Sequence, residues 1–256
     1  MPGITENSLF LLLLKIYAAL FVLGPIILRI QFRFNAKLDP QSVPLESLPA
    51  DVRGFFATRI SAITGLGFEL IGYVNVAMTK GTGSYMALFS NPRSLEWADI
   101  SAAKTSKLMK GYTEFITRCA NDEQVDTNTN ATAPVLSPQS SHHVFRFPQI
   151  QEPFTLYRVH RALVQQTLRG SQPELPPKGQ EIAELKRRLE RYGRQQSEQG
   201  YMYLDASGQF YRLTWKGAVL GAWRSIWPVN LLRSKWMEQQ NQTRLRSLGV
   251  QQVRPT

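Results

Sequence analysis

The segment FELIGYVNVAMTKGTGSYMALF (68–89) decides the fold class. Apolar and polar side chains alternate between Phe68 and Met78, which is the pattern of a strand with one buried face. Gly81-Thr82-Gly83 is typical of a tight turn, and Tyr85–Phe89 predicts a second strand. The turn has a passing similarity to a phosphate-binding loop, but it lacks the Lys-Ser/Thr ending and a following helix. We therefore predict a β-hairpin here.

The residues that follow extend this hairpin into a meander. Asn91-Pro92-Arg93-Ser94 is a turn sequence, and the alternation then resumes. Short strands joined by short turns form antiparallel sheets. Three more strands are predicted, at 95–102, at 112–119 and around Val125.

Helical patterns flank the predicted meander on both sides. Ser47 and Pro49 are typical of a helix start, and apolar residues follow at helical spacing as far as Ile63. Pro153 opens a second pattern that ends near Thr167. The sequence therefore predicts an α+β globular domain over 49–169, with helices packed on one face of a sheet.

Side chains able to carry chemistry are few. His142 and His143 lie in 127–143, whose Thr, Ser, Asn and Pro content predicts a mobile loop. His160 lies on an apolar helix side, where a buried, hydrogen-bonded ring is the ordinary expectation. The three histidines lack metal-ligand spacing. Cys119, the single cysteine, is expected to be a small buried side chain, since no base lies near it in the sequence.

Three acids stand close together after Cys119, at Asp122, Glu123 and Asp126. A cation site needs more oxygen ligands in a defined loop, so these acids predict a solvated turn. We predict no catalytic residues, no metal and no cofactor, and the balance of the residues favours a binding protein over an enzyme.

The N-terminal segment LFLLLLKIYAALFVLGPIIL (9–28) carries a single charge, Lys15. As a helix it is about 30 Å long, which matches the hydrocarbon core of a bilayer. The preceding residues contain no Lys or Arg and no cleavage site follows, unlike a signal peptide. The pattern predicts an uncleaved transmembrane helix over 9–30, with Lys15 reaching back to the headgroups.

Basic residues follow this segment at intervals of four, at Arg29, Arg33 and Lys37. The positive-inside rule then predicts an outward-facing N-terminus and a cytoplasmic soluble part. The expected localisation is the plasma (inner) membrane, as a single-pass protein.

The last third of the chain is basic, with 14 Lys and Arg against 7 Asp and Glu over 171–256, out of a net charge of +11 for the whole chain. GSQPELPPKGQ (170–180) predicts a linker. A short helix follows, and then a hairpin around Ala206-Ser207-Gly208. Thr214 can cap a further helix. A basic segment of this kind favours an acidic partner.

That helix opens WKGAVLGAWRSIWPVNLLRSKW (215–236), which holds four of the five tryptophans and no acid. The run before Pro228, 215–227, contains two charges and is too short and polar to span a bilayer, but it has the composition of an interfacial helix. The alternative is that the tryptophans cover the α+β domain. The predicted anchor favours membrane or partner contact, through Trp215, Lys216, Trp223, Arg224, Trp227, Arg233, Lys235 and Trp236.

Two stretches resemble parts of uncharacterised bacterial single-pass membrane-anchored proteins. They are YTEFITRCANDEQVDTNTN (112–130) and FYRLTWKGAVLGAWRSIWP (210–228). This resemblance implies an anchored protein but no activity. YMYLDASGQFYRLTWKG (201–217) is also similar to the wing of winged-helix DNA-binding proteins, which implies nucleic acid as an alternative partner.

We therefore predict an α+β protein with an N-terminal transmembrane helix, an antiparallel meander with flanking helices, and a helical, basic, Trp-rich C-terminal segment. Its expected function is membrane-anchored binding or scaffolding, with anionic lipid headgroups and a possible protein partner. The alternatives are a membrane-tethered nucleic-acid binder and an enzyme on a lipid or envelope substrate. The expected divisions are a tail at 1–8, a transmembrane helix at 9–30, a juxtamembrane linker at 31–48, a globular domain at 49–169, a linker at 170–180, and a helix-hairpin-helix segment at 181–256.

Overall fold

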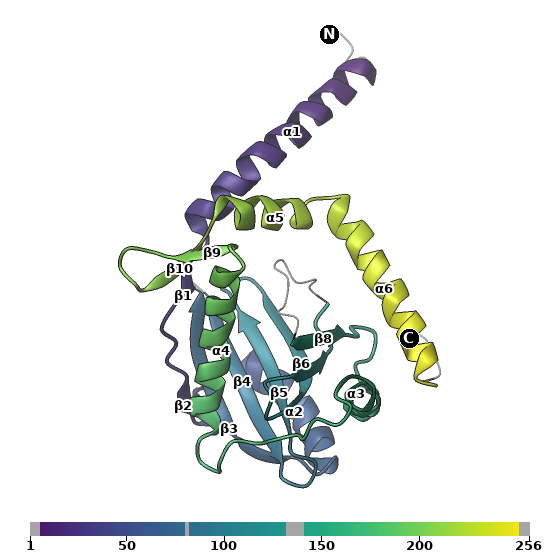
Figure 1. The fold of residues 1–256 in the computed structure, drawn as a ribbon. Coiled ribbons are helices and arrows are strands. Elements are labelled where there is room, and N and C mark those ends of the chain that lie inside the picture. Colours follow the sequence, from purple (N-terminus) through teal and green to yellow (C-terminus); the bar gives the residue numbers. More distant parts are fainter. Residues whose placement is uncertain (1–5, 80–81, 132–140, 251–256) are drawn as a thin grey trace.

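A computed structural model of the chain describes residues 6–79, 82–131 and 141–250. The described residues form one ten-stranded sheet and six α-helices (Figure 1). The helices are α1 (Glu6–Gln31), α2 (Ala50–Gly65), α3 (Pro153–Thr167), α4 (Glu181–Glu198), α5 (Trp215–Ser225) and α6 (Val229–Ser247), with a short 3-10 helix η1 (Leu45–Ser47) before α2. The strands are β1 (Phe34–Asn35), β2 (Gln41–Val43), β3 (Glu69–Thr79), β4 (Thr82–Asn91), β5 (Glu96–Lys104), β6 (Met109–Arg118), β7 (Gln124–Asn128), β8 (His142–Arg146), β9 (Met202–Leu204) and β10 (Phe210–Leu213).

The strand order is β8-β7-β6-β5-β4-β3-β1-β10-β9, and β2 also pairs with β3. The predicted meander corresponds to β3–β7, and every neighbouring pair within it is antiparallel. The predicted antiparallel meander is part of a larger, mixed sheet, because β8 runs parallel to β7. Residues 31–48, expected to be a linker, contribute β1 and β2 to the same sheet.

The larger core lies between one face of the sheet and α2 and α3. Alternate residues of β4–β6 point to this face, among them Phe89 and Phe115, and both are fully buried. Phe56 of α2 stacks on Tyr73 of β3 with 6.1 Å between the ring centroids. Each such side chain contributes roughly 1.5–3 kcal/mol through burial.

Local sequence fixes where α3 begins. Pro153 occupies its first turn, where the missing N–H costs nothing. The Glu152 carboxylate accepts hydrogen bonds from the backbone N–H groups of Phe154 and Thr155, at 2.8 and 2.5 Å. This cap satisfies two donors that would otherwise lack partners. α3 is therefore held against the sheet from its first residue.

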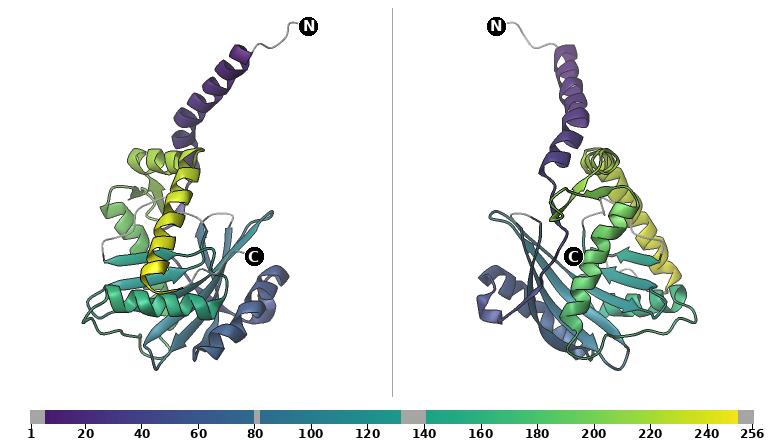
Figure 2. Two further views of the ribbon diagram at one scale, coloured as in Figure 1. Left: turned by 90° about the vertical axis from the view of Figure 1, so that its right-hand side faces the viewer. Right: turned by 60° about the vertical axis from the view of Figure 1, so that its left-hand side comes forward.

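Helix α4 covers the opposite face of the sheet, and it lies in front of β3–β6 in Figure 1 while α2 lies behind them. A second apolar cluster joins α4 to this face, with Leu185 packed among Val74, Met86 and Leu88. Figure 2 shows from two further sides that α5 lies near the carboxyl end of α4 and that α6 runs from there past β8. Asn241 of α6 donates a hydrogen bond to the carbonyl of Arg146 in β8.

The prediction of a transmembrane helix over 9–30, and with it the single-pass, inner-membrane localisation, is wrong. Over the stretches of chain that the structure describes, none of the helices is both long and apolar enough to cross a membrane. The carboxyl-terminal part of the predicted span instead packs on protein. Pro25 is buried, and Gly24 of α1 approaches the Cβ of Ala222 in α5.

The start of α5 depends on a glycine. Thr214 accepts a hydrogen bond from the N–H of Gly217 at 3.1 Å and donates to the carbonyl of Gly200 at 2.7 Å. These bonds bring the first turn of α5 onto the backbone of Tyr201, and a Cβ at position 217 would overlap the Tyr201 carbonyl. Only glycine fits this approach without movement.

We therefore expect Gly217→Ala to lower the free energy of unfolding by about 1–3 kcal/mol, because the added methyl forces α5 away from the backbone of Tyr201. Gly54→Ala in α2 is the matched control, since nothing lies within 4 Å of a Cβ there. The control should be neutral or stabilising by about 0.5–1 kcal/mol, through helix propensity. Urea unfolding of both variants checks this, and equal effects would contradict the packing argument.

Candidate ligand pocket and aromatic surface

Polar side chains occupy every second position on the sheet face beneath α4. Asp99 and Ser101 lie on β5, Glu114 on β6, Asp126 on β7 and His142 on β8. The strand register places Glu114 opposite Asp99, and Asn128 opposite Glu114. Asp99, Glu114 and Asp126 are only 1, 8 and 5% exposed. Three carboxyl groups are therefore buried together beside the second apolar cluster.

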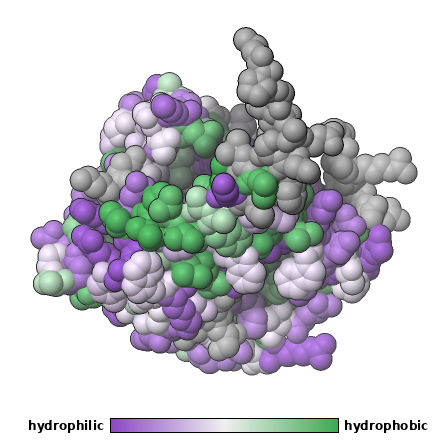
Figure 3. All heavy atoms as spheres, turned by 90° about the horizontal axis from the view of Figure 1, so that it is seen from above, coloured by the Kyte–Doolittle hydropathy of each residue, from purple (hydrophilic) through white to green (hydrophobic). Residues whose placement is uncertain are grey.

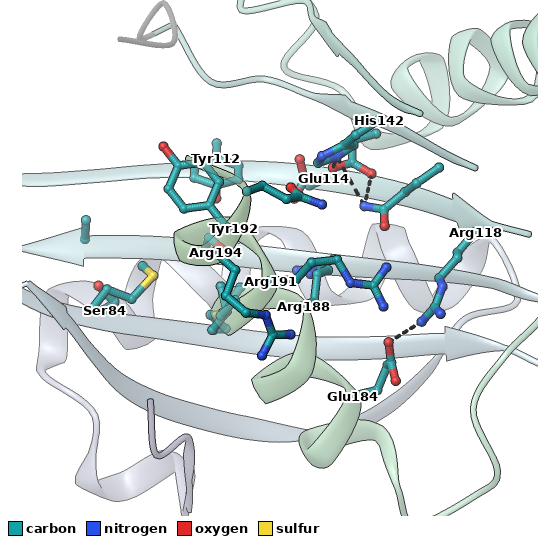
Figure 4. Close-up of a pocket in the computed structure, with 18 of the residues that line it drawn as sticks. Ser84, Tyr112, Glu114, Arg118, His142, Glu184, Arg188, Arg191, Tyr192 and Arg194 are labelled. Carbon is teal, nitrogen blue, oxygen red and sulfur yellow. Dashed lines mark hydrogen bonds and ion pairs between the residues drawn. The ribbon is translucent and has the colours of Figure 1, made fainter. Parts of the chain in front are cut away.

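Helix α4 supplies the facing side chains. Arg188, Arg191, Tyr192 and Arg194 lie within two turns of α4. Spacings of three and four residues place neighbouring members of this set on the same side of the helix. These residues and the polar positions of β4–β8 line a cavity of about 520 Å³. Figure 4 shows the arginines of α4 on one side and Tyr112 and Glu114 of β6 on the other. The pocket thus has a basic wall and a largely acidic wall.

Arg188 is the cation at the centre of the buried acids. Its guanidinium lies 3.4 Å from a carboxylate oxygen of Asp99, and the Ser101 hydroxyl donates to Asp99 at 2.6 Å. Burial raises the pKa of Asp99 above its ordinary value, against the opposing effect of Arg188. An uncompensated carboxylate here would be costly, so Arg188 is needed to hold the cluster.

Asp126 and His142 form a pair at the β7–β8 edge. His142 Nε2 lies 2.5 Å from Asp126 Oδ2, and the Gln124 amide donates to Asp126 at 2.7 Å. Burial opposes ionisation of Asp126, but the charge of His142 and its hydrogen bond hold the pKa of Asp126 below its ordinary value. Burial likewise opposes protonation of His142, and Asp126 overcomes it and raises the pKa of His142. The pair therefore favours the imidazolium–carboxylate state.

Glu114 carries a proton at neutral pH. Burial, and then the charges of Asp126 and Asp99, raise its pKa to about 8. Its Oε1 accepts a hydrogen bond from the Asn128 amide at 2.7 Å. The protonated carboxyl can donate a hydrogen bond as well as accept one. Titratable groups whose pKa values are pushed apart inside a cavity mark candidate functional sites.

The rim of the pocket contains a second set of ion pairs. Arg118 of β6 pairs with Glu184 of α4 and with Asp122, and Arg191 lies 3.0 Å from the same Asp122 carboxylate. Arg194, one turn further along α4, makes no ion pair with any residue that the structure describes. Its guanidinium is therefore available to an anion at the open end of the pocket.

His160 lies on the other face of the sheet and does not belong to this pocket. It is fully buried, and its ring nitrogens lie 2.9 Å from the Thr117 hydroxyl and 3.0 Å from the Thr127 hydroxyl. Burial lowers its pKa to about 4 despite nearby Glu96. The prediction of a buried, hydrogen-bonded histidine is confirmed.

Sequence reasoning missed two members of the pocket. Asp126 was assigned to a solvated turn and His142 to a mobile loop, yet both lie in paired strands. The remainder of that predicted loop, 132–140, lies outside the described residues. The usable signal was the two-residue spacing of Gln124, Asp126 and Asn128, which places three polar side chains on one face of a strand. Among the described residues, no three His, Cys, Asp or Glu side chains are placed to hold a metal ion.

Of the four flank residues predicted from the sequence, Lys15 and Arg29 lie in α1, and Arg33 and Lys37 lie just before and just after β1. Lys15 and Lys37 are exposed. The Arg29 guanidinium lies over the Trp215 ring at 4.5 Å, and that of Arg33 lies 5.9 Å from the Phe210 ring centroid. Both arginines thus contact aromatic rings of the C-terminal segment.

The predicted tryptophan contacts lie on a separate surface formed by α5 and α6. Trp215, Trp223, Trp227 and Trp236 are 53, 51, 66 and 59% exposed, so they are not core residues. Lys216 donates to the carbonyl of Gln199 at 2.9 Å, and Lys235 is exposed. Arg224 and Arg233 are partly exposed. The predicted wing does not stand apart, because β10 pairs with β1 in the sheet.

Neither family models, nor curated proteins, nor solved structures give a match to this chain.

Proposed function

We propose that this protein binds a small organic anion that also carries a hydroxyl or amino group, in the pocket between α4 and the sheet. The observation that carries this proposal is the pairing of a basic wall on α4 with a protonated Glu114 and the Asp126–His142 pair across the cavity. A concave pocket with a few convergent polar groups is the usual form of a small-molecule site.

The basic wall suits a carboxylate or a phosphate. Arg191 has one carboxylate neighbour and Arg194 has none among the described residues, so donors remain for a ligand. Guanidinium groups bind carboxylates and phosphates through two parallel hydrogen bonds. The anionic end of the ligand therefore belongs at the open end, beside α4.

The sheet wall suits a polar, uncharged or amino end. Glu114 offers a donor and acceptor side by side, and Asp126 offers an acceptor already oriented by His142 and Gln124. A cavity of about 520 Å³ lies within the range typical of small-molecule pockets. The ligand class is thus a hydroxy acid, an amino acid or a sugar phosphate.

The second candidate function is proton-transfer catalysis on such a molecule. It is favoured by one observation, namely that Glu114 holds a proton near neutral pH within the same pocket as His142. Recovery of every bound ligand unchanged after incubation would support binding, and turnover of any of them would support the enzyme.

We expect calorimetry against hydroxy acids, amino acids, sugar phosphates and inorganic phosphate to reveal at least one binder. Arg194→Gln should weaken it about tenfold, the equivalent of one charge-assisted hydrogen bond at an exposed site. Lys186→Gln is the matched control, because Lys186 is an exposed cation of α4 outside the pocket lining. Binding should also weaken above about pH 8, where Glu114 loses its proton. A panel without binders, or equal effects of the two substitutions, would count against the proposal.

A further inference from the structure

We propose that the exposed face of α5 and α6 docks on an anionic lipid surface, lying on it without crossing it. We name this face the aromatic ridge. It consists of the exposed apolar side chains of α5, of α6 and of the turn between them: Trp215, Val219, Trp223, Trp227, Leu231, Leu232 and Trp236. The proposal does not depend on the pocket, because α4 and the sheet face contribute none of these residues.

On α5, the aromatic ridge is the solvent-exposed side of the helix. Trp215, Val219 and Trp223 follow one another at intervals of four residues, and all three are about half exposed. The opposite side carries Gly217, Ala218, Gly221 and Ala222, which are buried. Contacts with α1 and Tyr201 occupy that small-residue side. The tryptophans therefore point outward, because the small residues on the opposite side of α5 make the contacts with α1 and Tyr201.

Neighbouring helix α1 enlarges the apolar area. It also exposes apolar side chains along its length, among them Leu20, Leu23 and Ile27. Figure 3 looks down on this end of the molecule and shows hydrophobic residues gathered there. Exposed apolar areas of this kind mark interaction surfaces in soluble proteins.

The charges around the ridge determine which partner fits. Lys216, Arg224, Arg233 and Lys235 lie within 215–236, which contains no acid. A second copy of the chain docked through the same face would set these cations against one another. A lipid surface with anionic headgroups has the complementary charge, and it accepts tryptophan rings at the boundary between headgroups and acyl chains.

The chemistry of tryptophan favours lipid over nucleic acid. Each ring presents an apolar body with one polar N–H, which matches the gradient of polarity at a bilayer surface. The apolar Val219, Leu231 and Leu232 between the rings would gain nothing from a sugar-phosphate backbone, whereas each can be buried among acyl chains. The occupant is therefore a bilayer surface that contains acidic phospholipid.

The test uses the full chain with vesicles of phosphatidylcholine alone or mixed with phosphatidylglycerol. Because four of the five tryptophans are exposed and Trp97 is buried, emission should begin red-shifted and move to the blue only with the mixed vesicles. Lys216→Gln combined with Lys235→Gln should weaken vesicle binding about 30-fold at low salt, from about 1 kcal/mol for each charge. Trp223→Ser with Trp227→Ser should abolish the blue shift.

The charge-matched control is Lys107→Gln with Lys186→Gln, two exposed lysines away from the ridge. It should bind vesicles as the unaltered protein does, and circular dichroism should show that all variants remain folded. Equal binding to both kinds of vesicle, no spectral shift, or equal loss in the control would overturn the proposal. So would a Trp-dependent dimer in solution, or retardation of duplex DNA by a protein that ignores vesicles.

Discussion

Replacing Arg188 by Gln is expected to lower the free energy of unfolding by about 3–5 kcal/mol at neutral pH. Arg188 is the cation that lies against Asp99, and Asp126 is buried in the same cluster. Removing its charge leaves the buried Asp99 carboxylate without a compensating cation, and this costs more than the loss of the hydrogen bond alone. Chemical denaturation at pH 7 measures the change.

A neighbouring arginine provides the control for this prediction. Arg187 is exposed and pairs with Glu184 at 2.7 Å, so Arg187→Gln should cost less than about 1 kcal/mol. Adding Asp99→Asn to Arg188→Gln should restore part of the lost stability, since the buried charge is then removed together with its partner. If the two arginine variants unfold alike, the cluster beneath α4 is not an electrostatic unit.

Replacing Glu114 by Gln is expected to stabilise the protein, by an amount that grows with pH. The native state keeps the Glu114 proton up to a pKa of about 8, whereas an unfolded chain releases it near the ordinary glutamate pKa of 4.5. Between these values the unfolded state binds fewer protons, so the stability of the unaltered protein falls as pH rises. Gln has no proton to lose and keeps the neutral, hydrogen-bonding shape.

The expected gain for Glu114→Gln is small at pH 5 and on the order of 2–4 kcal/mol at pH 8, from the size of the pKa shift. Urea unfolding at both pH values measures it. Glu69→Gln serves as the control, because Glu69 is an exposed acid at the start of β3, and it should change stability little at either pH. A gain for Glu114→Gln that does not depend on pH would show that Glu114 is already ionised in the native state.

Much of the sheet could be predicted because alternation is a local property. The strand pattern around Val74 and Val76, and the turn at Asn91, gave the meander that β3–β7 form. Strand β8 escaped prediction because a parallel partner comes from a separate part of the chain and leaves no turn signal next to it.

The pocket could not be predicted because its environment depends on a distant element. Polar residues such as Glu114 and Asp126 alternate with apolar ones, and alone this pattern indicates a solvated face. Helix α4 covers that face, and it begins more than fifty residues after Asp126 in the chain. The sequence shows the amphipathic stripe of α4 but not the face on which it packs. Burial then changes the pKa of Glu114, which no local pattern records.

The composition of the tryptophan-rich stretch 215–236 does not distinguish core residues from interface residues, because tryptophan suits both environments. The distinction depends on which side of α5 is buried. Gly217 and Gly221 lie on the buried side, so the tryptophans lie on the exposed side. The segment 9–28 is an instance where composition misled, since apolar content alone did not distinguish a span from a helix whose end packs on α5.

Amide NMR with the same panel of organic anions shows whether the cavity beneath α4 is where a ligand binds. We expect saturable shifts for Tyr112, Glu114, Arg188 and Arg194, with the signal of His160 on the opposite face of the sheet unchanged. Saturable shifts confined to residues outside this lining, or no saturable shift with any member of the panel, would contradict this expectation.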